Sequence, residues 1–174
     1  VVITGWERNY HKYIPKCKEI FYAKTIEEWI SICVKCLNLR IKPILNSIPG
    51  RQEVHLNFTL DTAHNQQAIN YLMKNSVDFE IVILGMLKDK DIETFILELP
   101  SNSVILACNV KSERSSSPEE IYEICRRLNI KCKKYINVSE AISSVKGEKT
   151  LITGSFYTVS EAREYFKLDG YSEL

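Results

Sequence analysis

Apolar residues recur at two different spacings, which alternate along the chain from residue 54 onward. The run Val54–Leu60 alternates apolar and polar side chains, which predicts a strand, and Gln66–Asn75 carries its apolar residues on one helical face. Glu80–Leu84 and Ser103–Cys108 are nearly continuous apolar runs, which predict strands buried on both faces. The remaining predicted elements are helices at Asp91–Leu99, Ser117–Leu128, Ser139–Val145 and Thr158–Lys167, with Glu161 in the capping position of the last, and strands at Lys131–Tyr135 and Lys149–Thr153.

Five strand–helix steps within about 110 residues predict an α/β fold. Because crossover connections between parallel strands are right-handed, such a succession folds into a doubly wound, mostly parallel, Rossmann-like sheet with helices on both faces. We expect this sheet to extend from Val54 to Thr153.

Residues 1–45 have a different pattern from the rest of the chain. Tyr10–Tyr22 is basic and aromatic and contains a proline, which predicts irregular or edge structure. Thr25–Asn38 begins with a capping box and continues with helical spacing, so a helix is predicted there. We therefore expect two parts: a short, partly helical segment at 1–45 that is the tail of a preceding domain and a linker, and an α/β domain at 46–174. The first residue is not methionine, which suggests a domain excised from a longer protein.

Composition narrows the possible partners. A net charge of +1 disfavours nucleic acid and anionic membranes, and the longest apolar runs are too short to span a bilayer. The chain has six cysteines, and several occupy apolar positions of predicted helices and strands. Cys33-x-x-Cys36 is a single pair without a second pair at zinc-finger spacing. We expect six free thiols, no bound metal and a cytoplasmic location.

Polar side chains gather where predicted strands end. In a parallel sheet the carboxyl ends of the strands share one edge, and ligands bind there. The polar residues that follow these ends include Asp61, His64, Asn65, Lys88, Asp89 and Ser155. Together they predict a ligand site. For Asp61 a second interpretation stays open, in which it caps the helix that begins at Gln66.

Four motifs carry a resemblance to a known family. They are Pro49-Gly50-Arg51-x-Glu53, Leu60-Asp61-x-Ala63-His64-Asn65, Gly85-Met86-x-Lys88-Asp89-Lys90-Asp91 and Gly154-Ser155-Phe156-Tyr157-x-Val159-x-Glu161-Ala162-Arg163. In this order and spacing they resemble the carboxy-terminal half of folylpolyglutamate synthase/dihydrofolate synthase, within the Mur ligase superfamily. The resemblance implies a Mur ligase C-terminal-like domain at 46–174 and the tail of the central ligase domain at 1–45.

The resemblance also implies an ATP-dependent carboxylate–amine ligase. Such enzymes use ATP and Mg²⁺ to form an acyl phosphate on folate or dihydropteroate, and the amine of L-glutamate then attacks it. On this pattern Arg51 and Asp61 contact the nucleotide, His64 has a catalytic role, and His64 and Ser155 contact the glutamate. A guanidinium suits phosphate because it binds oxygens bidentately. Further candidates at this edge are Asn65, Lys88 and Asp89. For the last two, ordinary surface pairing explains the charges equally well.

The chain also departs from the family pattern. Thr62 stands where the family usually has a small or apolar residue, and Gln66 where proline is frequent. The sequence contains no Gly-x-x-Gly-Lys-[Ser/Thr] phosphate loop, which the amino-terminal ATPase domain supplies in the family together with the magnesium site. We therefore expect the isolated chain to bind neither ATP nor Mg²⁺ and to be inactive.

Two other functions stay open from the sequence. One is a non-catalytic nucleotide- or amino-acid-binding module, and the other is a ligase domain acting on a peptidoglycan precursor. The Gly-Ser-Phe-Tyr segment and the Lys-Asp-Lys-Asp turn favour folate. The expected partners are the amino-terminal ATPase domain of the same enzyme, folate or dihydropteroate, and L-glutamate, and the protein is expected to be a monomer.

Overall fold

The computed structural model describes residues 2–4, 20–22, 31–33, 35, 48–75 and 78–168. The chain divides into two compact units, Val1–Asn46 and Ser47–Leu174. In the first unit β1 (Val2–Thr4) pairs in parallel with β2 (Ile20–Tyr22). Residues 31–33 and 35 are helical, and the rest of the helix predicted at Thr25–Asn38 lies outside the described residues.

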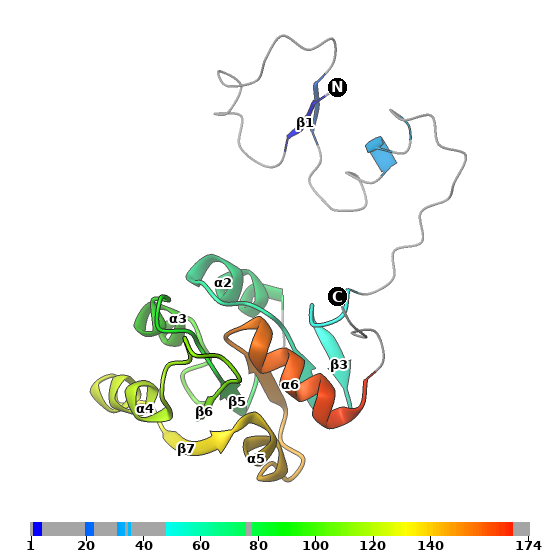
Figure 1. The fold of residues 1–174 in the computed structure, drawn as a ribbon. Helices are drawn as coiled ribbons and strands as arrows, with labels where there is room; N and C mark the ends of the chain where they lie inside the picture. Colours follow the sequence, from blue (N-terminus) through cyan, green and yellow to red (C-terminus); the bar gives the residue numbers. More distant parts are fainter. Residues whose placement is uncertain are drawn as a thin grey trace. The chain divides into compact units, whose positions relative to one another are not determined.

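The second unit is built on a six-stranded sheet in the order β3-β4-β8-β5-β6-β7 (Figure 1). Its strands are β3 (Glu53–His55), β4 (Phe58–Leu60), β5 (Ile81–Leu84), β6 (Val104–Asn109), β7 (Cys132–Asn137) and β8 (Thr150–Thr153). β3 and β4 are antiparallel, and the other four neighbouring pairs are parallel. This architecture confirms the predicted doubly wound, mostly parallel α/β fold.

The prediction of a single strand at Val54–Leu60 is wrong, because this segment forms the hairpin of β3 and β4. His55 pairs with Phe58, and Leu56 at the turn has a φ of +55°. Asn57 holds the turn against the segment before β8, since its Nδ2 donates to the Glu148 carbonyl at 2.8 Å. The apolar residues of the first half, Val54 and Leu56, are exposed, and only the second half enters the core.

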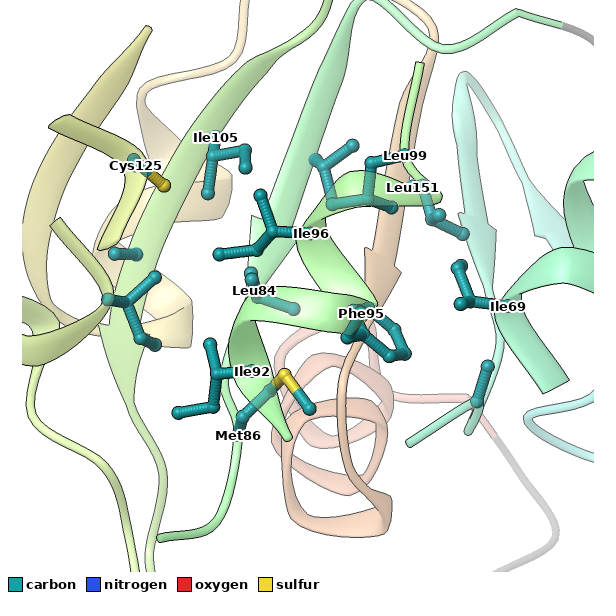
Figure 2. Close-up of a cluster of buried hydrophobic side chains, with 14 of the residues drawn as sticks. Ile69, Leu84, Met86, Ile92, Phe95, Ile96, Leu99, Ile105, Cys125 and Leu151 are labelled. Atoms are coloured by element: carbon teal, nitrogen blue, oxygen red, sulfur yellow. The ribbon is translucent and has the colours of Figure 1, made fainter. Parts of the chain in front are cut away.

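Five helices cover the two faces of the sheet. They are α2 (Gln66–Asn75), α3 (Ile92–Leu97), α4 (Pro118–Arg127), α5 (Val138–Ser143) and α6 (Phe156–Phe166). α2, α3 and α4 pack on one face around Phe95 (Figure 2), and α5 and α6 pack on the other. Successive residues of β5 serve opposite faces, since Val82 and Leu84 join the first cluster and Ile83 the second. No helix within the described ranges is long and apolar enough to cross a membrane.

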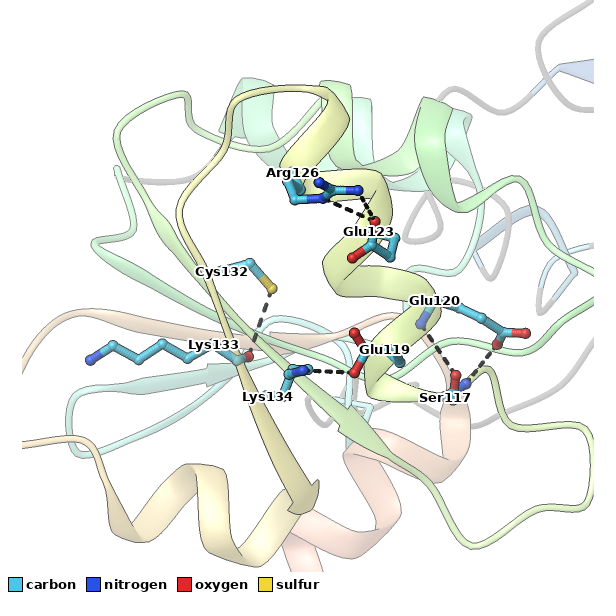
Figure 3. A network of polar contacts seen from close by, with 8 residues as sticks. All are labelled: Ser117, Glu119, Glu120, Glu123, Arg126, Cys132, Lys133 and Lys134. Carbon is cyan, nitrogen blue, oxygen red and sulfur yellow. Dashed lines mark hydrogen bonds and ion pairs between the residues drawn. The ribbon is translucent and has the colours of Figure 1, made fainter.

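The predicted N-cap residues of two helices, α4 and α6, can be compared with the structure. The Ser117–Glu120 capping box of α4 is present as predicted, with 3.2 Å from the Glu120 N–H to Ser117 Oγ (Figure 3). The predicted start of the last helix at Thr158 is wrong, because Ser155 is the N-cap and α6 begins at Phe156. Glu161 is buried and accepts the Lys111 N–H at 2.6 Å instead of closing a capping box.

Candidate functional site

Three loops converge at the carboxyl edge of the sheet because β8 lies between β4 and β5. The loop after β8 is joined to the loop after β4 by the Gly154 N–H, which donates to the Ala63 carbonyl at 3.0 Å. The helix that follows this loop, α6, is joined to the loop after β5 by Thr158, whose hydroxyl donates to the Gly85 carbonyl at 2.6 Å. Gly154 has a φ of +105°, and a Cβ there would lie 2.7 Å from the Gly85 oxygen, so only glycine fits.

A pocket of ≈ 310 Å³ opens where these loops meet. Its walls are His64, Leu87, Lys90, Arg114, Gly154, Ser155, Phe156 and Tyr157. The pocket therefore unites two of the predicted site residues, His64 and Ser155, with two cationic side chains. Sequence reasoning had placed Lys90 within a motif without assigning it a role, and it had missed Arg114.

The hydrogen bond of His64 determines which ring nitrogen carries the proton in the neutral ring. His64 Nδ1 lies 3.0 Å from the Thr62 carbonyl oxygen. A carbonyl only accepts, so Nδ1 carries the proton and Nε2 of the neutral ring keeps its lone pair. The ring also lies against Phe156, with centroids 5.9 Å apart. In its neutral form His64 at the pocket wall therefore has one ring nitrogen that can accept a hydrogen bond.

Ser155 has two roles at the start of α6. Its Oγ accepts the Thr158 N–H at 3.1 Å and lies 2.7 Å from Thr158 Oγ1. Because the Thr158 hydroxyl proton is donated to Gly85, the proton of the second contact belongs to Ser155. Ser155 Oγ therefore has one lone pair left for a ligand, and it can accept a hydrogen bond but has no proton to donate.

Positive charge predominates at the mouth of the pocket. Lys90 Nζ lies 2.8 Å from one Asp89 oxygen, and Arg114 Nη1 lies 3.8 Å from the other. The hydrogen bond from Lys90 lowers the pKa of Asp89, so this carboxylate stays ionised at neutral pH. Two cations facing one carboxylate leave a net attraction for an anionic group. Asp89, a predicted candidate, thus pairs with both cations that line the pocket.

Arg114 reaches the pocket through backbone contacts between two loops. The Lys88 N–H donates to the Arg114 carbonyl at 2.9 Å, and Leu87 forms an isolated antiparallel bridge with Ser115. Lys88, another predicted candidate, therefore contributes its main chain here, and its side chain is absent from the pocket walls. No periodicity or motif marks Arg114 in the sequence, because its position depends on this pairing.

Asp61 supports the loop that carries Arg51. Its two carboxylate oxygens accept the Gln52 N–H at 3.0 Å and the Ala63 N–H at 2.8 Å, and the side chain is buried. The interpretation of Asp61 as the cap of α2 is wrong, since Asn65 Oδ1 accepts the Ala68 N–H at 2.9 Å and serves that purpose. Asn65, a further predicted candidate, is therefore a capping residue here.

Arg51 lies outside the pocket walls but is connected to them. Its guanidinium carbon lies 5.8 Å from the centre of the Phe156 ring, within the range of a cation–π contact. Phe156 is thus shared between Arg51 and His64. Arg51 is exposed, and no carboxylate among the described residues pairs with it. Its donors are consequently available to an anionic ligand.

The described residues offer no obvious metal site. No group of three or more His, Cys, Asp or Glu side chains within the described ranges is placed to hold a metal ion. Of the six cysteines, Cys33, Cys108, Cys125 and Cys132 are free thiols, and Cys17 and Cys36 lie outside the described residues.

A six-stranded, mostly parallel sheet with a pocket at its carboxyl edge defines a doubly wound α/β domain, and this fold is consistent with that of a Mur ligase C-terminal domain. Searches against protein-family sequence models and curated proteins gave no match. Among solved structures, the chain is similar to bifunctional folylpolyglutamate synthase/dihydrofolate synthase from Yersinia pestis, with a TM-score of 0.60 and 26% identity over 70% of this chain. Escherichia coli FolC in complex with ADP has a TM-score of 0.58 and 28% identity over 69% of it. Folylpolyglutamate synthase from Thermotoga maritima, at 22% identity over 73%, has a TM-score of 0.63 and supports the fold.

Each of these alignments covers 32% of the longer chain. This chain is therefore similar to about a third of a folylpolyglutamate synthase/dihydrofolate synthase, which confirms the resemblance predicted from its four motifs.

Proposed function

We propose that this chain is the C-terminal, glutamate- and nucleotide-contacting domain of an ATP-dependent amide ligase that adds L-glutamate to folate or dihydropteroate. The observation that carries the proposal is the pocket in which His64, Ser155, Lys90 and Arg114 meet. Glutamate has an amino group that needs acceptors and carboxylates that need cations. The pocket offers both kinds of group.

In this proposal the amino group of glutamate faces His64 and Ser155. Nε2 of His64 removes a proton from the ammonium, and the remaining lone pair of Ser155 Oγ accepts a second N–H. The neutral amine then attacks the activated carboxyl carbon of folate or dihydropteroate, the new C–N bond forms, and the bond from this carbon to the phosphate oxygen breaks. The departing phosphate takes the second proton that the amine nitrogen loses. Lys90 and Arg114 hold the carboxylates of the glutamate during this step.

ATP and Mg²⁺ belong to the complete ligase in this proposal. Arg51 fits a phosphate, because it is exposed and has no carboxylate partner among the described residues. The described residues do not fit Mg²⁺ in the same way, because they form no suitable ligand group. The amino-terminal ATPase domain would hold the metal, and Arg51 would contact the nucleotide from the opposite side.

The test is steady-state ligation in the complete enzyme with Lys90→Ala and Arg114→Ala. Losing a charge-assisted hydrogen bond should raise the KM for glutamate at least about tenfold in each variant and leave the KM for ATP unchanged. Arg127→Ala is the matched control, since Arg127 is an exposed arginine paired with Glu93 on another surface. Unchanged glutamate KM values in both pocket variants would contradict the proposal, and so would an open reading frame that encodes no ATPase domain.

A further inference from the structure

The buried hydroxyl of Thr158 lies between the pocket wall and the loop after β5 and makes two hydrogen bonds there. Its Oγ1 donates to the Gly85 carbonyl at 2.6 Å and lies 2.7 Å from Ser155 Oγ. A carbonyl oxygen only accepts, so the Thr158 proton is used on Gly85, and the proton between the two hydroxyls comes from Ser155. The hydrogen bonds therefore run in one direction, from Ser155 to Thr158 to Gly85.

The helix cap does not require this hydroxyl. Ser155 Oγ caps α6 by accepting the backbone N–H of Thr158 at 3.1 Å, and every residue except proline has such an N–H. The loop after β5 nevertheless leaves room for the hydroxyl, since a Cβ at Gly85 would lie 2.8 Å from Thr158 Oγ1. The Thr158 hydroxyl is thus separate from the cap, and it determines where the Ser155 proton points.

Two hydrogen-bond acceptors consequently line the same pocket. Ser155 Oγ keeps one lone pair, and neutral His64, with Nδ1 3.0 Å from the Thr62 carbonyl oxygen, keeps the lone pair on Nε2. An amino group has enough N–H bonds to donate to both acceptors. A hydroxyl in the same place donates to one of them and turns its own oxygen toward the other. The pair of acceptors therefore favours an amine over a hydroxyl.

We propose that Thr158 is a positioning residue that takes the proton of Ser155, holds Ser155 as an acceptor, and so makes the pocket select an amino acid over the corresponding 2-hydroxy acid. This inference rests on the proposed function, in which the amino group of glutamate faces His64 and Ser155. Thr158 is absent from the pocket walls and acts through Ser155. Without its hydroxyl, Ser155 is free to turn its proton into the pocket and to donate to the oxygen of a 2-hydroxy acid.

The experiment is steady-state ligation by the complete ligase carrying Thr158→Val, which keeps the shape and the backbone N–H but loses the hydroxyl. The readout is the Ki of 2-hydroxyglutarate, as a competitor of glutamate, divided by the KM for glutamate. This ratio should fall at least about tenfold in Thr158→Val, and Thr158→Ser should restore it because serine keeps the hydroxyl. A ratio that stays constant or rises in Thr158→Val would overturn the proposal, and so would a Thr158→Ser variant that restores nothing.

Thr150 at the other end of β8 supplies the matched control. Like Thr158 it is fully buried, and its hydroxyl donates to a carbonyl, that of Glu148, at 2.8 Å. Neither Thr150 nor Glu148 lines the pocket. Thr150→Val should therefore lower the stability and leave the ratio unchanged. An equal fall of the ratio in Thr150→Val would show that selectivity follows overall stability, and it would count against the role of Thr158.

The wild-type enzyme decides the outcome if Thr158→Val fails to fold. Glutarate lacks the amino group, and 2-hydroxyglutarate differs from it by one hydroxyl. Because that hydroxyl brings one proton to two acceptors, 2-hydroxyglutarate should bind less than about tenfold tighter than glutarate. A larger gain would show that the pocket supplies a donor, contrary to the proposal.

The pocket variants Lys90→Ala and Arg114→Ala separate this inference from the proposed function. If both leave the KM for glutamate unchanged, the proposed function and the role of Thr158 fail together. If they raise this KM while Thr158→Val leaves the ratio unchanged, glutamate still binds in the pocket and only the role of Thr158 is wrong.

Discussion

Arg163 of α6 donates to both carboxylate oxygens of Glu53 in β3, a residue 110 positions earlier in the chain. The Arg163 side chain is only 3% exposed, and Glu53 also accepts the Gly50 N–H at 2.7 Å. The pair ties the loop that carries Arg51 to the helix that begins beside Ser155. Glu53 and Arg163 are thus structural partners that hold two motifs together.

We predict that Glu53→Gln destabilises the protein by about 3 kcal/mol, because it replaces the carboxylate that faces the buried Arg163 guanidinium with a neutral amide. The free energy of unfolding from urea titration measures this loss. Glu164→Gln is the control, because its partner Lys111 is exposed and the 2.7 Å pair should contribute little. Similar losses in the two variants would contradict a special role for the buried pair.

We predict that Asp61→Asn lowers both stability and turnover. Asparagine has one acceptor oxygen, so either the Gln52 or the Ala63 N–H loses its partner, at a cost of about 1–2 kcal/mol in the free energy of unfolding. Thermal melting and steady-state ligation in the complete enzyme measure the two effects. Asn65→Ala is the comparison: it removes the cap of α2 and should cost about 1 kcal/mol in stability with little change in turnover. A silent Asp61→Asn would refute the loop-supporting role.

We predict that Arg51→Ala lowers kcat/KM of the complete ligase by an amount equivalent to about 1.5–3 kcal/mol, through loss of a phosphate contact. Because Arg51 is exposed, the melting temperature should hardly change. Arg51→Lys should restore little activity, since an ammonium does not reproduce the bidentate geometry. Normal turnover in both variants would remove Arg51 from the nucleotide site.

We predict that Glu161→Gln stabilises the protein at neutral pH but not in acid. Burial raises the pKa of Glu161 above its ordinary value of 4.5, so the folded state holds this proton more tightly than the unfolded state. The favourable contribution of that proton is fully present below pH 4.5 and is lost as the pH rises through the raised pKa. The substituted glutamine would keep an oxygen for the Lys111 N–H. The difference in unfolding free energy between variant and wild type should therefore grow with pH, and a constant difference would contradict the prediction.

We predict that the isolated chain hydrolyses no ATP and forms no amide bond at any glutamate concentration. The sequence lacks the phosphate loop, and phosphoryl transfer depends on the electrostatic stabilisation that this loop and its metal provide. Release of labelled phosphate and formation of glutamylated folate are the measurements. Ligation by the purified chain alone would overturn the assignment of catalysis to a second domain.

Local signals in the sequence were sufficient for most of the fold. Continuous apolar runs such as Ile81–Leu84 form buried strands because only strands covered on both faces need apolar side chains at every position. The cap of α4 was equally predictable, because Ser117 and Glu120 interact with each other across a single turn. Such features depend on neighbours within a few residues.

The hairpin at Leu56 and the cap at Ser155 were not predictable in the same way. Alternation of apolar and polar residues is similar in one strand of seven residues and in two short strands, and the turn is held by Asn57 contacting residues far along the chain. The Ser155 cap is itself a local contact with the Thr158 N–H, but Thr158 was the predicted start of this helix. The Thr158 hydroxyl donates instead to the Gly85 carbonyl, 73 positions earlier in the chain, which no local pattern indicates.

The sequence alone determined the α/β class, the alternation of strands and helices, and the resemblance of four motifs to a ligase family. These properties depend only on the spacing of apolar residues and on short residue patterns, which can be recognised without the structure. Only the tertiary structure decided that β8 inserts between β4 and β5, and that insertion is what places Ser155 beside His64. It likewise brought Arg114 to Lys90 through pairing between two loops. Contacts between residues this far apart follow from how the sheet and its layers close over the core, and no local pattern encodes them.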